Sequence, residues 1–192
     1  MIFVIDTSSA VSSLAILDDQ WAVRQEMHLP ARSPELMDRM RAMASGARLT
    51  KVAVATGPGS FTGLRMGVSF GLGLAMGLRI PIVPLPTLDL QAARSDTPAI
   101  AVSEAGRGRV YYLAPGGAPS LGEPVDVPTT HPLVGSVSPA LRSALTEAGH
   151  AFRPEGELRS FGAAASRLLH TARDVPYDSL KLEYMQSFSA SR

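Results

Sequence analysis

Residues 54–83 read VATGPGSFTGLRMGVSFGLGLAMGLRIPIV, and this stretch has the apolar periodicity of a helix although it is rich in glycine. Each glycine inside a helix costs roughly 1 kcal/mol relative to alanine, so the predicted helix at residues 60–78 gives up about 4–5 kcal/mol unless close packing repays it. Its five internal glycines are Gly63, Gly67, Gly71, Gly73 and Gly77.

Both faces of this predicted helix are apolar. At about 100° per residue, the five glycines share one arc of roughly 160°. Between them project Met66, Phe70, Leu74 and Leu78. The opposite arc carries Leu64, Val68, Leu72, Ala75 and Met76. Because an all-round apolar helix must be covered on both sides, we expect the protein's own sheet to cover one face and a partner to cover the glycine face.

The composition excludes several classes of function. The 192 residues carry a formal net charge of +1, which gives no electrostatic footprint for holding a nucleic acid directly. The sequence has no cysteine, so disulfides, thiolate zinc sites and cysteine nucleophiles are excluded. The four histidines are scattered without ligand spacing, and we expect no metal site.

The N-terminus predicts a cytoplasmic protein. Residues 2–6 (IFVID) already form the pattern of a buried strand, with no basic region or cleavage site before them. The apolar run at 64–78 is short and contains Arg65, so we do not expect it to span a membrane.

The first half of the chain predicts an α/β unit. Strand patterns at residues 2–6, 12–18 and 21–27 predict an antiparallel meander. Further along, we expect a helix at 33–43, with Ser33 as N-cap and Pro34 in its first turn. A strand at 52–55, the glycine-rich helix and a strand at 81–83 then form a right-handed parallel crossover, followed by a helix at 88–93.

The second half of the chain differs from the first in composition and pattern. Two strands surround a Gly/Arg turn within residues 99–115, and residues 115–139 are rich in proline and glycine. Helical patterns return at 140–148 and 161–172. We therefore place a boundary near residues 95–98 and expect an N-terminal lobe at 1–96 and a smaller C-terminal lobe at 97–192.

The helix at 33–43 carries a stripe of methionines on its apolar face. This stripe fits core packing, and it also fits an adaptable contact surface, because methionine packs against varied shapes. The face consists of Leu36, Met37, Met40, Met43 and Ala44.

Two short segments are candidates for phosphate chemistry. Asp6, Thr7 and Ser8 end the first strand, where phosphotransferases hold magnesium and phosphate, although taken alone these residues favour a turn with local hydrogen bonds. The run GPGSFTG at 57–63 fits an anion-binding nest or a simple helix start capped by Ser60 or Thr62. It lacks the lysine of a P-loop, and no GxSxG elbow supports a protease.

Three segments together resemble the bacterial TsaB (YeaZ) family. They are VIDTSSAVSSLAIL at 4–17, the run from 54 to 92, and EAGRGRVYY at 104–112. The matches cover roughly residues 2–112. LEYMQ at 182–186 is similar to the family's closing Pro-x-Tyr-Leu-Arg signature without its proline and arginine.

The resemblance implies an actin-like α/β fold of two lobes with mixed sheets, the second lobe shortened. It implies a non-catalytic, cytoplasmic subunit that binds and stabilises TsaD, which carries out N6-threonylcarbamoyl transfer to tRNAs that read codons beginning with adenine. The chain is expected to form a homodimer when alone and to have TsaE as a further partner. It is expected to hold no tightly bound cofactor, with ATP or ADP at the interface of the complex.

The resemblance places the partner interface on the two N-terminal helices. We expect Gly67→Leu to abolish pairing and to leave the monomer folded. The expected interface residues are Met37, Met40, Gly63, Met66, Gly67, Phe70, Gly71 and Leu74.

Two other functions stay open at this point. One is a small actin-like kinase or ATPase that uses Asp6 and the loop at 57–63. The other is a self-contained homodimer that acts as an interaction module unrelated to tRNA.

Overall fold

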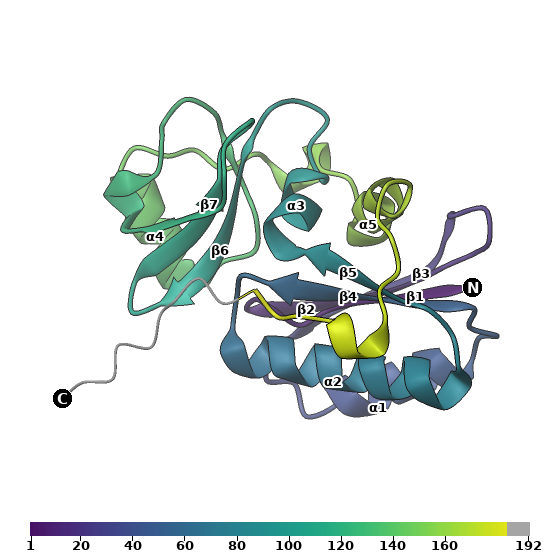
Figure 1. The fold of residues 1–192 in the computed structure, drawn as a ribbon. Coiled ribbons are helices and arrows are strands. Elements are labelled where there is room, and N and C mark those ends of the chain that lie inside the picture. Colours follow the sequence, from purple (N-terminus) through teal and green to yellow (C-terminus); the bar gives the residue numbers. More distant parts are fainter. Residues whose placement is uncertain (184–192) are drawn as a thin grey trace.

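The structure is a computed structural model, and residues 1–183 of it are described (Figure 1). It contains two sheets, and the first has five strands in the order β3-β2-β1-β4-β5. These strands are β1 (Ile2–Asp6), β2 (Val11–Leu17), β3 (Val23–Pro30), β4 (Lys51–Gly57) and β5 (Ile82–Pro86).

The predicted meander and crossover are both confirmed. β2 pairs antiparallel with β1 and with β3. β4 pairs parallel with β1 and with β5. The mixed sheet follows from the connections, because short turns join antiparallel strands whereas a helix is needed to return to a parallel one.

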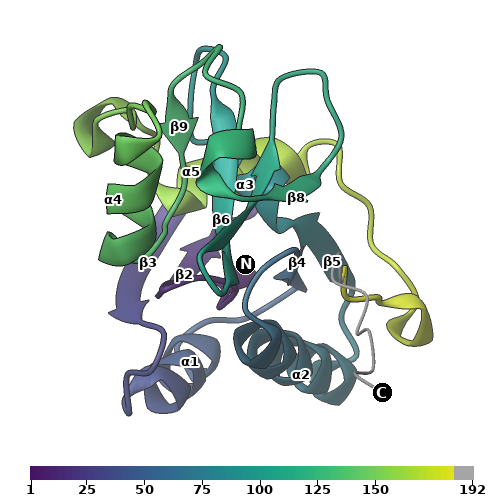
Figure 2. The same ribbon diagram turned by 90° about the vertical axis from the view of Figure 1, so that its left-hand side faces the viewer.

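Helices cover both faces of this sheet (Figure 2). On one face lie α1 (Leu36–Ser45) and α2 (Phe61–Leu78), which pack on Phe3 and Ile5 of β1. On the other lie α3 (Thr87–Ala92) and α5 (Phe161–Leu169), which pack on the alternate residues Ile2 and Val4. β1 is therefore buried from both sides, as its unbroken apolar run predicts.

The two predicted helix starts differ in outcome. Of the two predicted caps, Ser60 and Thr62, it is Ser60 that forms the N-cap of α2, and its Oγ accepts the N–H of Gly63. The prediction that Ser33 caps α1 is wrong, because α1 begins only at Leu36. The N–H of Leu36 donates to the carbonyl oxygen of Ser33 at 3.2 Å, and this three-residue turn separates the serine from the helix.

The second sheet has the order β8-β7-β6-β9, with β9 parallel to β6 and the other pairs antiparallel. Its predicted hairpin is present, whereas the two short outer strands lie in the Pro/Gly-rich stretch where we expected none. The elements are β6 (Ile100–Gly106), β7 (Arg109–Leu113), β8 (Ser120–Gly122), β9 (Leu133–Val134) and the covering helix α4 (Pro139–Glu147).

The last part of the chain returns to the first sheet. α5 packs on β2 and β3, and Phe161 and Leu169 belong to the same core cluster as Ile2 and Val4. The strands divide between two sheets near residue 96, and α5 packs on the first of them.

Residues 173–183, here called the C-terminal strap, run beside α2 on the side away from α1 (Figure 2). The N–H of Val175 donates to Ile82 at the edge of the sheet, and the N–H of Glu183 donates to Thr56 at the end of β4. Tyr177 donates its hydroxyl proton to the carbonyl oxygen of Ile80 at 2.9 Å. Sequence reasoning missed this packing. Residues 184–186 of the closing LEYMQ signature lie outside the described residues.

Candidate functional site

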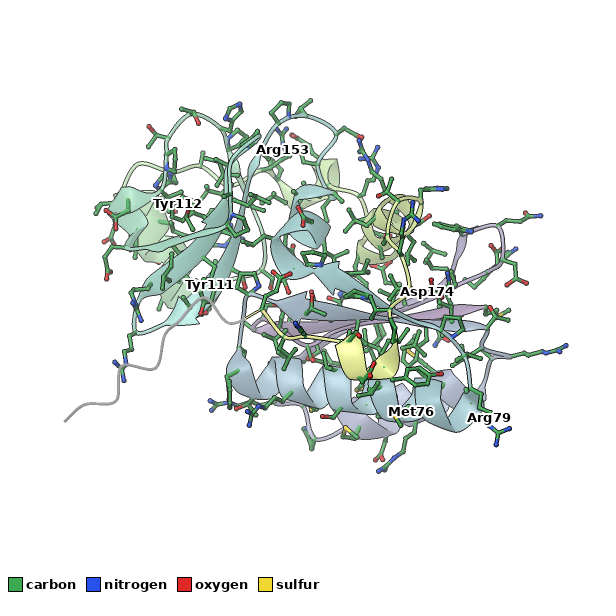
Figure 3. The ribbon with its side chains drawn as sticks, viewed as in Figure 1. Met76, Arg79, Tyr111, Tyr112, Arg153 and Asp174 are labelled. Carbon is green, nitrogen blue, oxygen red and sulfur yellow. The ribbon has the colours of Figure 1, made fainter. Side chains whose placement is uncertain are left out.

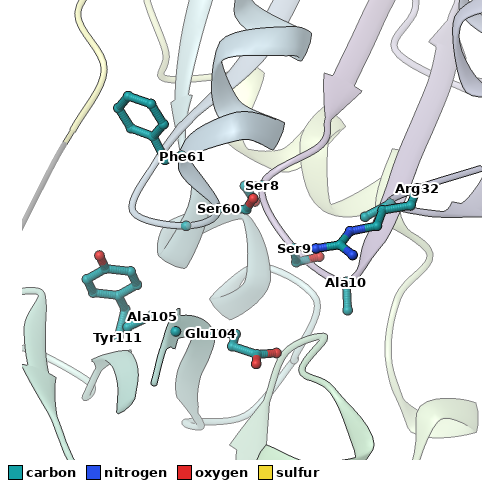
Figure 4. Close-up of a pocket in the computed structure, with 12 residues that line it drawn as sticks. Ser8, Ser9, Ala10, Arg32, Ser60, Phe61, Glu104, Ala105 and Tyr111 are labelled. Atoms are coloured by element: carbon teal, nitrogen blue, oxygen red, sulfur yellow. The ribbon is translucent and has the colours of Figure 1, made fainter. Parts of the chain in front are cut away.

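A cleft of about 440 Å³ opens where the end of β1 and the start of α2 face the β6–β7 hairpin (Figure 4). Ser9 and Arg32 lie on one side of the cleft, and Glu104 and Tyr111 come from the hairpin. This is where the candidate phosphate residues of the sequence were expected to act.

Asp6, Thr7 and Ser8 are all buried, and Ser8 lines this cleft. The Asp6 carboxylate accepts the backbone N–H of Ser8 at 2.8 Å and its hydroxyl proton at 2.6 Å. Burial raises the pKa of Asp6, and the two bonds from Ser8 act against that rise. Thr7 donates its hydroxyl proton to the carbonyl oxygen of Gly63. This arrangement is the locally hydrogen-bonded turn.

The loop at 57–63 closes directly onto that turn. The N–H of Ser60 donates to the carbonyl oxygen of Ser8 at 2.6 Å, and a Cβ on Gly59 would overlap Ser8. A Cβ on Gly63 would overlap the carbonyl oxygen of Thr7. These two glycines therefore serve the contact between two loops of the chain itself.

The β6–β7 hairpin forms the opposite wall of the cleft. Glu104 accepts the N–H of Ser138 at 3.1 Å, so its carboxylate holds the start of α4. Arg107 occupies the left-handed region with φ of 54° between Gly106 and Gly108, which makes the turn tight. Within residues 1–183, no group of three or more His, Cys, Asp or Glu side chains could hold a metal ion.

The glycines of α2 lie differently from the expected partner face. Gly67 and Gly71 are buried toward the sheet, where a Cβ would overlap Thr7 Oγ1 and Val54 Cγ1 respectively. Gly73 and Gly77 are exposed, with open space around them. The glycines of the arc thus divide between the face that packs on the sheet and the exposed surface of α2. Gly67→Leu would disturb the fold itself, so the expectation of a folded but unpaired Gly67→Leu monomer is not compatible with this packing.

An apolar groove of about 570 Å³ lies between α1 and α2 on the outer surface, here called the α1–α2 groove. Three of the expected interface residues, Met37, Phe70 and Leu74, line this groove. A fourth, Met40, does not line it and is fully buried in the core. Met66 is half-buried and packs on the same core cluster. The groove is lined by Met37, Arg41, Ala44, Ser45, Ser69, Phe70, Gly73, Leu74 and Leu78.

The expected interface residues did not include two residues of α2 that line the groove, Ser69 and Gly73, although Gly73 belongs to the glycine face that a partner was expected to cover. The period of α2 could have found them once the sheet-facing residues were known, because Ser69 and Gly73 lie one turn apart on the same side. At the C-terminal end of α2, Met76 and Arg79 also project outward (Figure 3).

By length and composition, α2 alone among the described helices is long and apolar enough to cross a membrane. In the structure, however, Leu64, Val68 and Ala75 bury one of its faces on the sheet. α2 therefore packs on the sheet with one face and leaves much of the rest of its surface uncovered within the described residues.

Comparison with known proteins gives a consistent family. The family model described as TsaD, tRNA N6-adenosine threonylcarbamoyltransferase, matches residues 34–131, which is half of the chain. The tRNA threonylcarbamoyladenosine biosynthesis protein TsaB of Escherichia coli is 31% identical over 58% of this chain and 53% of its own length. TsaB of Bacillus subtilis is 31% identical over 57% of this chain and 52% of its own. The chain thus spans about half the length of these relatives.

Solved structures share the fold. A Pseudomonas aeruginosa protein described as similar to peptidase YeaZ aligns with a TM-score of 0.69 at 19% identity, over 96% of this chain and 99% of that one. YeaZ from Pseudomonas aeruginosa aligns with a TM-score of 0.67 over the same shares. The two mixed sheets are therefore the actin-like α/β fold that the sequence predicts. The chain belongs to the TsaD family, and the relatives that it resembles within it are the TsaB (YeaZ) proteins.

Proposed function

We propose that this chain is a non-catalytic subunit that binds and stabilises a TsaD protein for N6-threonylcarbamoyladenosine modification of tRNAs reading codons that begin with adenine. The E. coli and B. subtilis relatives are named for the biosynthesis of this modified nucleoside. A role on tRNA would place the protein in the cytoplasm.

The observation that carries the proposal is the α1–α2 groove. Its floor and walls are formed by Met37, Phe70, Leu74 and Leu78, and Leu78 is 49% exposed. Contiguous exposed apolar surface of this kind marks protein–protein contacts. A helix of TsaD would lie in the groove with its apolar side chains between those of α1 and α2, and a second copy of this chain would occupy it when TsaD is absent.

The buried state of Asp6 supports a subunit without its own phosphotransfer chemistry. A magnesium-binding carboxylate has to present oxygen atoms to the ion. One oxygen of Asp6 accepts two hydrogen bonds from Ser8, and the side chain is 2% exposed. A nucleotide, ATP or ADP, would bind at the interface with TsaD, and TsaE would join that complex.

The test is multi-angle light scattering on a sizing column, with this chain alone and mixed with the TsaD protein of the same genome. We expect a homodimer alone and a one-to-one heterodimer in the mixture. Gly73→Glu places a carboxylate in the groove at a position with open space, and it should abolish both species without unfolding the monomer. Gly156→Glu, at an equally open glycine between α4 and α5, is the matched control and should pair normally. Normal pairing by Gly73→Glu would contradict the interface.

The alternative is a small kinase or ATPase, which the 440 Å³ cleft favours because it lies between the two sheets. Isothermal titration of the isolated chain with ATP and ADP distinguishes the two functions. Stoichiometric binding with turnover would favour the enzyme, whereas a chain that binds nucleotide only in the mixture with TsaD would favour the subunit.

A further inference from the structure

Within residues 1–183 the chain crosses between the two sheets twice, and the two crossings bind each other. Residues 93–99 lead from α3 to β6 of the second sheet. Residues 148–160 lead from α4, which packs on that sheet, back to α5 on the first sheet. The contacts between residues 94–97 and residues 153–159 are here called the clasp.

Hydrogen bonds join the two halves of the clasp. The N–H of Arg159 donates to the carbonyl oxygen of Arg94 at 2.8 Å, and Arg94 Nε donates to the carbonyl oxygen of Arg159 at 3.3 Å. Arg153 donates to Thr97 Oγ1 at 2.6 Å. The backbone bond between residues 94 and 159 is therefore a fixed point of contact, and side-chain bonds lie on either side of it along the chain.

Two ion pairs add to these bonds. Arg94 pairs with Glu155, and Arg159 pairs with Asp96, so each half of the clasp supplies one arginine and one carboxylate. Arg167 Nη1 of α5 lies 3.8 Å from the same Asp96 carboxylate, which links the clasp to a helix on the first sheet. The Arg94 side chain is only 14% exposed, so its ion pair is partly shielded from water and stronger than one at the open surface.

The packing of α3 on both sheets does not by itself fix the angle between them. Leu90 of α3 belongs to the core cluster of the first sheet, and Leu88 packs with residues of the second. Apolar attraction is non-directional, so it holds the sheets together and tolerates a small rotation. Hydrogen bonds and charge-assisted pairs depend on direction, and those of the clasp can set the angle.

β6 connects the clasp to the cleft. It begins at Ile100, close to Thr97, and at its other end the β6–β7 hairpin forms one wall of the cleft. A strand of seven residues is about 20 Å long, so a rotation of about 10° at the clasp would move the hairpin by about 3–4 Å. A small change of angle at the clasp would thus alter the width of the cleft.

We infer that the clasp is a conformational lock, whose side-chain bonds and ion pairs fix the angle between the two sheets and with it the width of the cleft. Loss of these contacts leaves each sheet folded, because the apolar clusters of both sheets remain. It lets the second sheet rotate against the first about the backbone contact of Arg94 and Arg159.

The test is a distance measurement between spin labels on the two sides of the clasp. The sequence has no cysteine, so Gln20→Cys and Ser143→Cys, at two exposed residues, provide the labelling sites. Gln20 lies in the turn between β2 and β3 and Ser143 on α4, and this turn and α4 lie at opposite ends of the molecule (Figure 1). Double electron–electron resonance on labelled chain, diluted with unlabelled chain, measures the distance within one molecule.

The clasp variant combines Asp96→Asn, Thr97→Val and Glu155→Gln. All three side chains are exposed and keep their shapes, while both ion pairs and the acceptor of Arg153 are lost. We expect its distance distribution to shift or broaden by about 3 Å or more relative to the unchanged chain, as the length of β6 implies.

The matched control makes the same three kinds of change away from the crossings. It combines Glu35→Gln and Asp38→Asn, which remove two ion pairs at α1, with Thr146→Val on α4. Its distance distribution should equal that of the unchanged chain. An unchanged distribution in the folded clasp variant would overturn the inference, and so would an equal shift in the control. If the triple variant does not unfold cooperatively, Asp96→Asn with Glu155→Gln gives the same test with the same two outcomes.

Discussion

Glycines of the same helix have opposite roles in this protein, and their surroundings explain why. Gly67 and Gly71 lie on the face of α2 that packs on the sheet. Gly67 lies against Thr7 and Ile5, and Gly71 lies against Val54 and Val52. Their missing side chains let the helix approach the sheet closely. Gly73 and Gly77 have nothing within 4 Å, so their cost to the helix is not repaid within the monomer.

A pair of alanine substitutions tests this difference. Gly67→Ala should lower the free energy of unfolding by about 1–3 kcal/mol, because overpacking against Thr7 outweighs the gain in helix propensity. Gly77→Ala should raise it by roughly 0.5–1 kcal/mol, because only the propensity changes. Urea denaturation of both variants measures the two values. Equal effects at the two positions would show that Gly67 does not pack as described.

Glu26 links the edge strand β3 to α5. Its carboxylate accepts the N–H of Phe161 at 3.0 Å and of Gly162 at 2.8 Å, which are free donors at the start of that helix. Burial opposes its charge, but the hydrogen bonds from Gly162, Ser160 and Phe161 lower the pKa of Glu26 below the ordinary 4.5. The stability from ionised Glu26 is therefore present above pH 4.5 and is lost as pH falls through the folded-state pKa.

Glu26→Gln removes this titration. At neutral pH the variant should be less stable than the unchanged chain by about 1–2 kcal/mol, the usual worth of a helix cap. The difference should shrink as the pH is lowered below 4.5, because the unchanged chain then loses its carboxylate. Thermal unfolding of both proteins between pH 3 and 7 measures it, and a constant difference over that range would refute the role of the charge.

At the scale of elements, apolar periodicity and cap chemistry predicted α2 almost to the residue. Its start at Ser60 has a local cause, and a local pattern can reveal it. The face of α2 that meets the sheet was not predictable, because both arcs are apolar and the choice depends on Thr7 and Val54, which are distant in the sequence. The same limit applies to Met40. The methionine stripe to which it belongs fitted either core packing or a contact surface, and in the structure Met40 lies in the core.

The C-terminal strap was also beyond prediction. Its bonds join Val175 to Ile82 and Glu183 to Thr56, and no short-range pattern carries such pairings. Similarly, the turn from Ser33 to Leu36 delays α1 although Ser33 and Pro34 form a good starting signal. In the candidate site, the sequence left two alternatives for Asp6, Thr7 and Ser8, a magnesium and phosphate site or a turn with local hydrogen bonds, and the structure has the hydrogen-bonded turn.

The strap has a testable anchor in Tyr177. Its hydroxyl lies 2.9 Å from the carbonyl oxygen of Ile80 and 3.2 Å from that of Ala75, at the C-terminal end of α2. Tyr177→Phe keeps the ring and leaves these carbonyl groups without that donor, so the free energy of unfolding should fall by about 1 kcal/mol. Denaturant unfolding provides the value. Tyr112→Phe, on β7 of the other lobe, is a control for loss of a tyrosine hydroxyl and should have a smaller effect.

At the scale of the whole molecule, two surfaces are candidates for the pairing function: the cleft beside Ser8 and the α1–α2 groove. In the first, the polar groups of Asp6 and Ser8 are tied to each other. The second is mostly apolar and is lined by side chains of both α1 and α2, which suits a protein partner. We therefore assign the pairing function to the helices and not to the cleft.

Hydrogen exchange followed by mass spectrometry tests this assignment most directly. Two samples are compared: the Gly73→Glu variant alone, which serves as the monomeric reference, and the unchanged chain bound to TsaD. We predict that binding TsaD slows exchange in α1 and α2 of the unchanged chain and leaves the β6–β7 hairpin unaffected. Protection confined to the hairpin and the loop after β1, with α1 and α2 exchanging as in the reference, would contradict it.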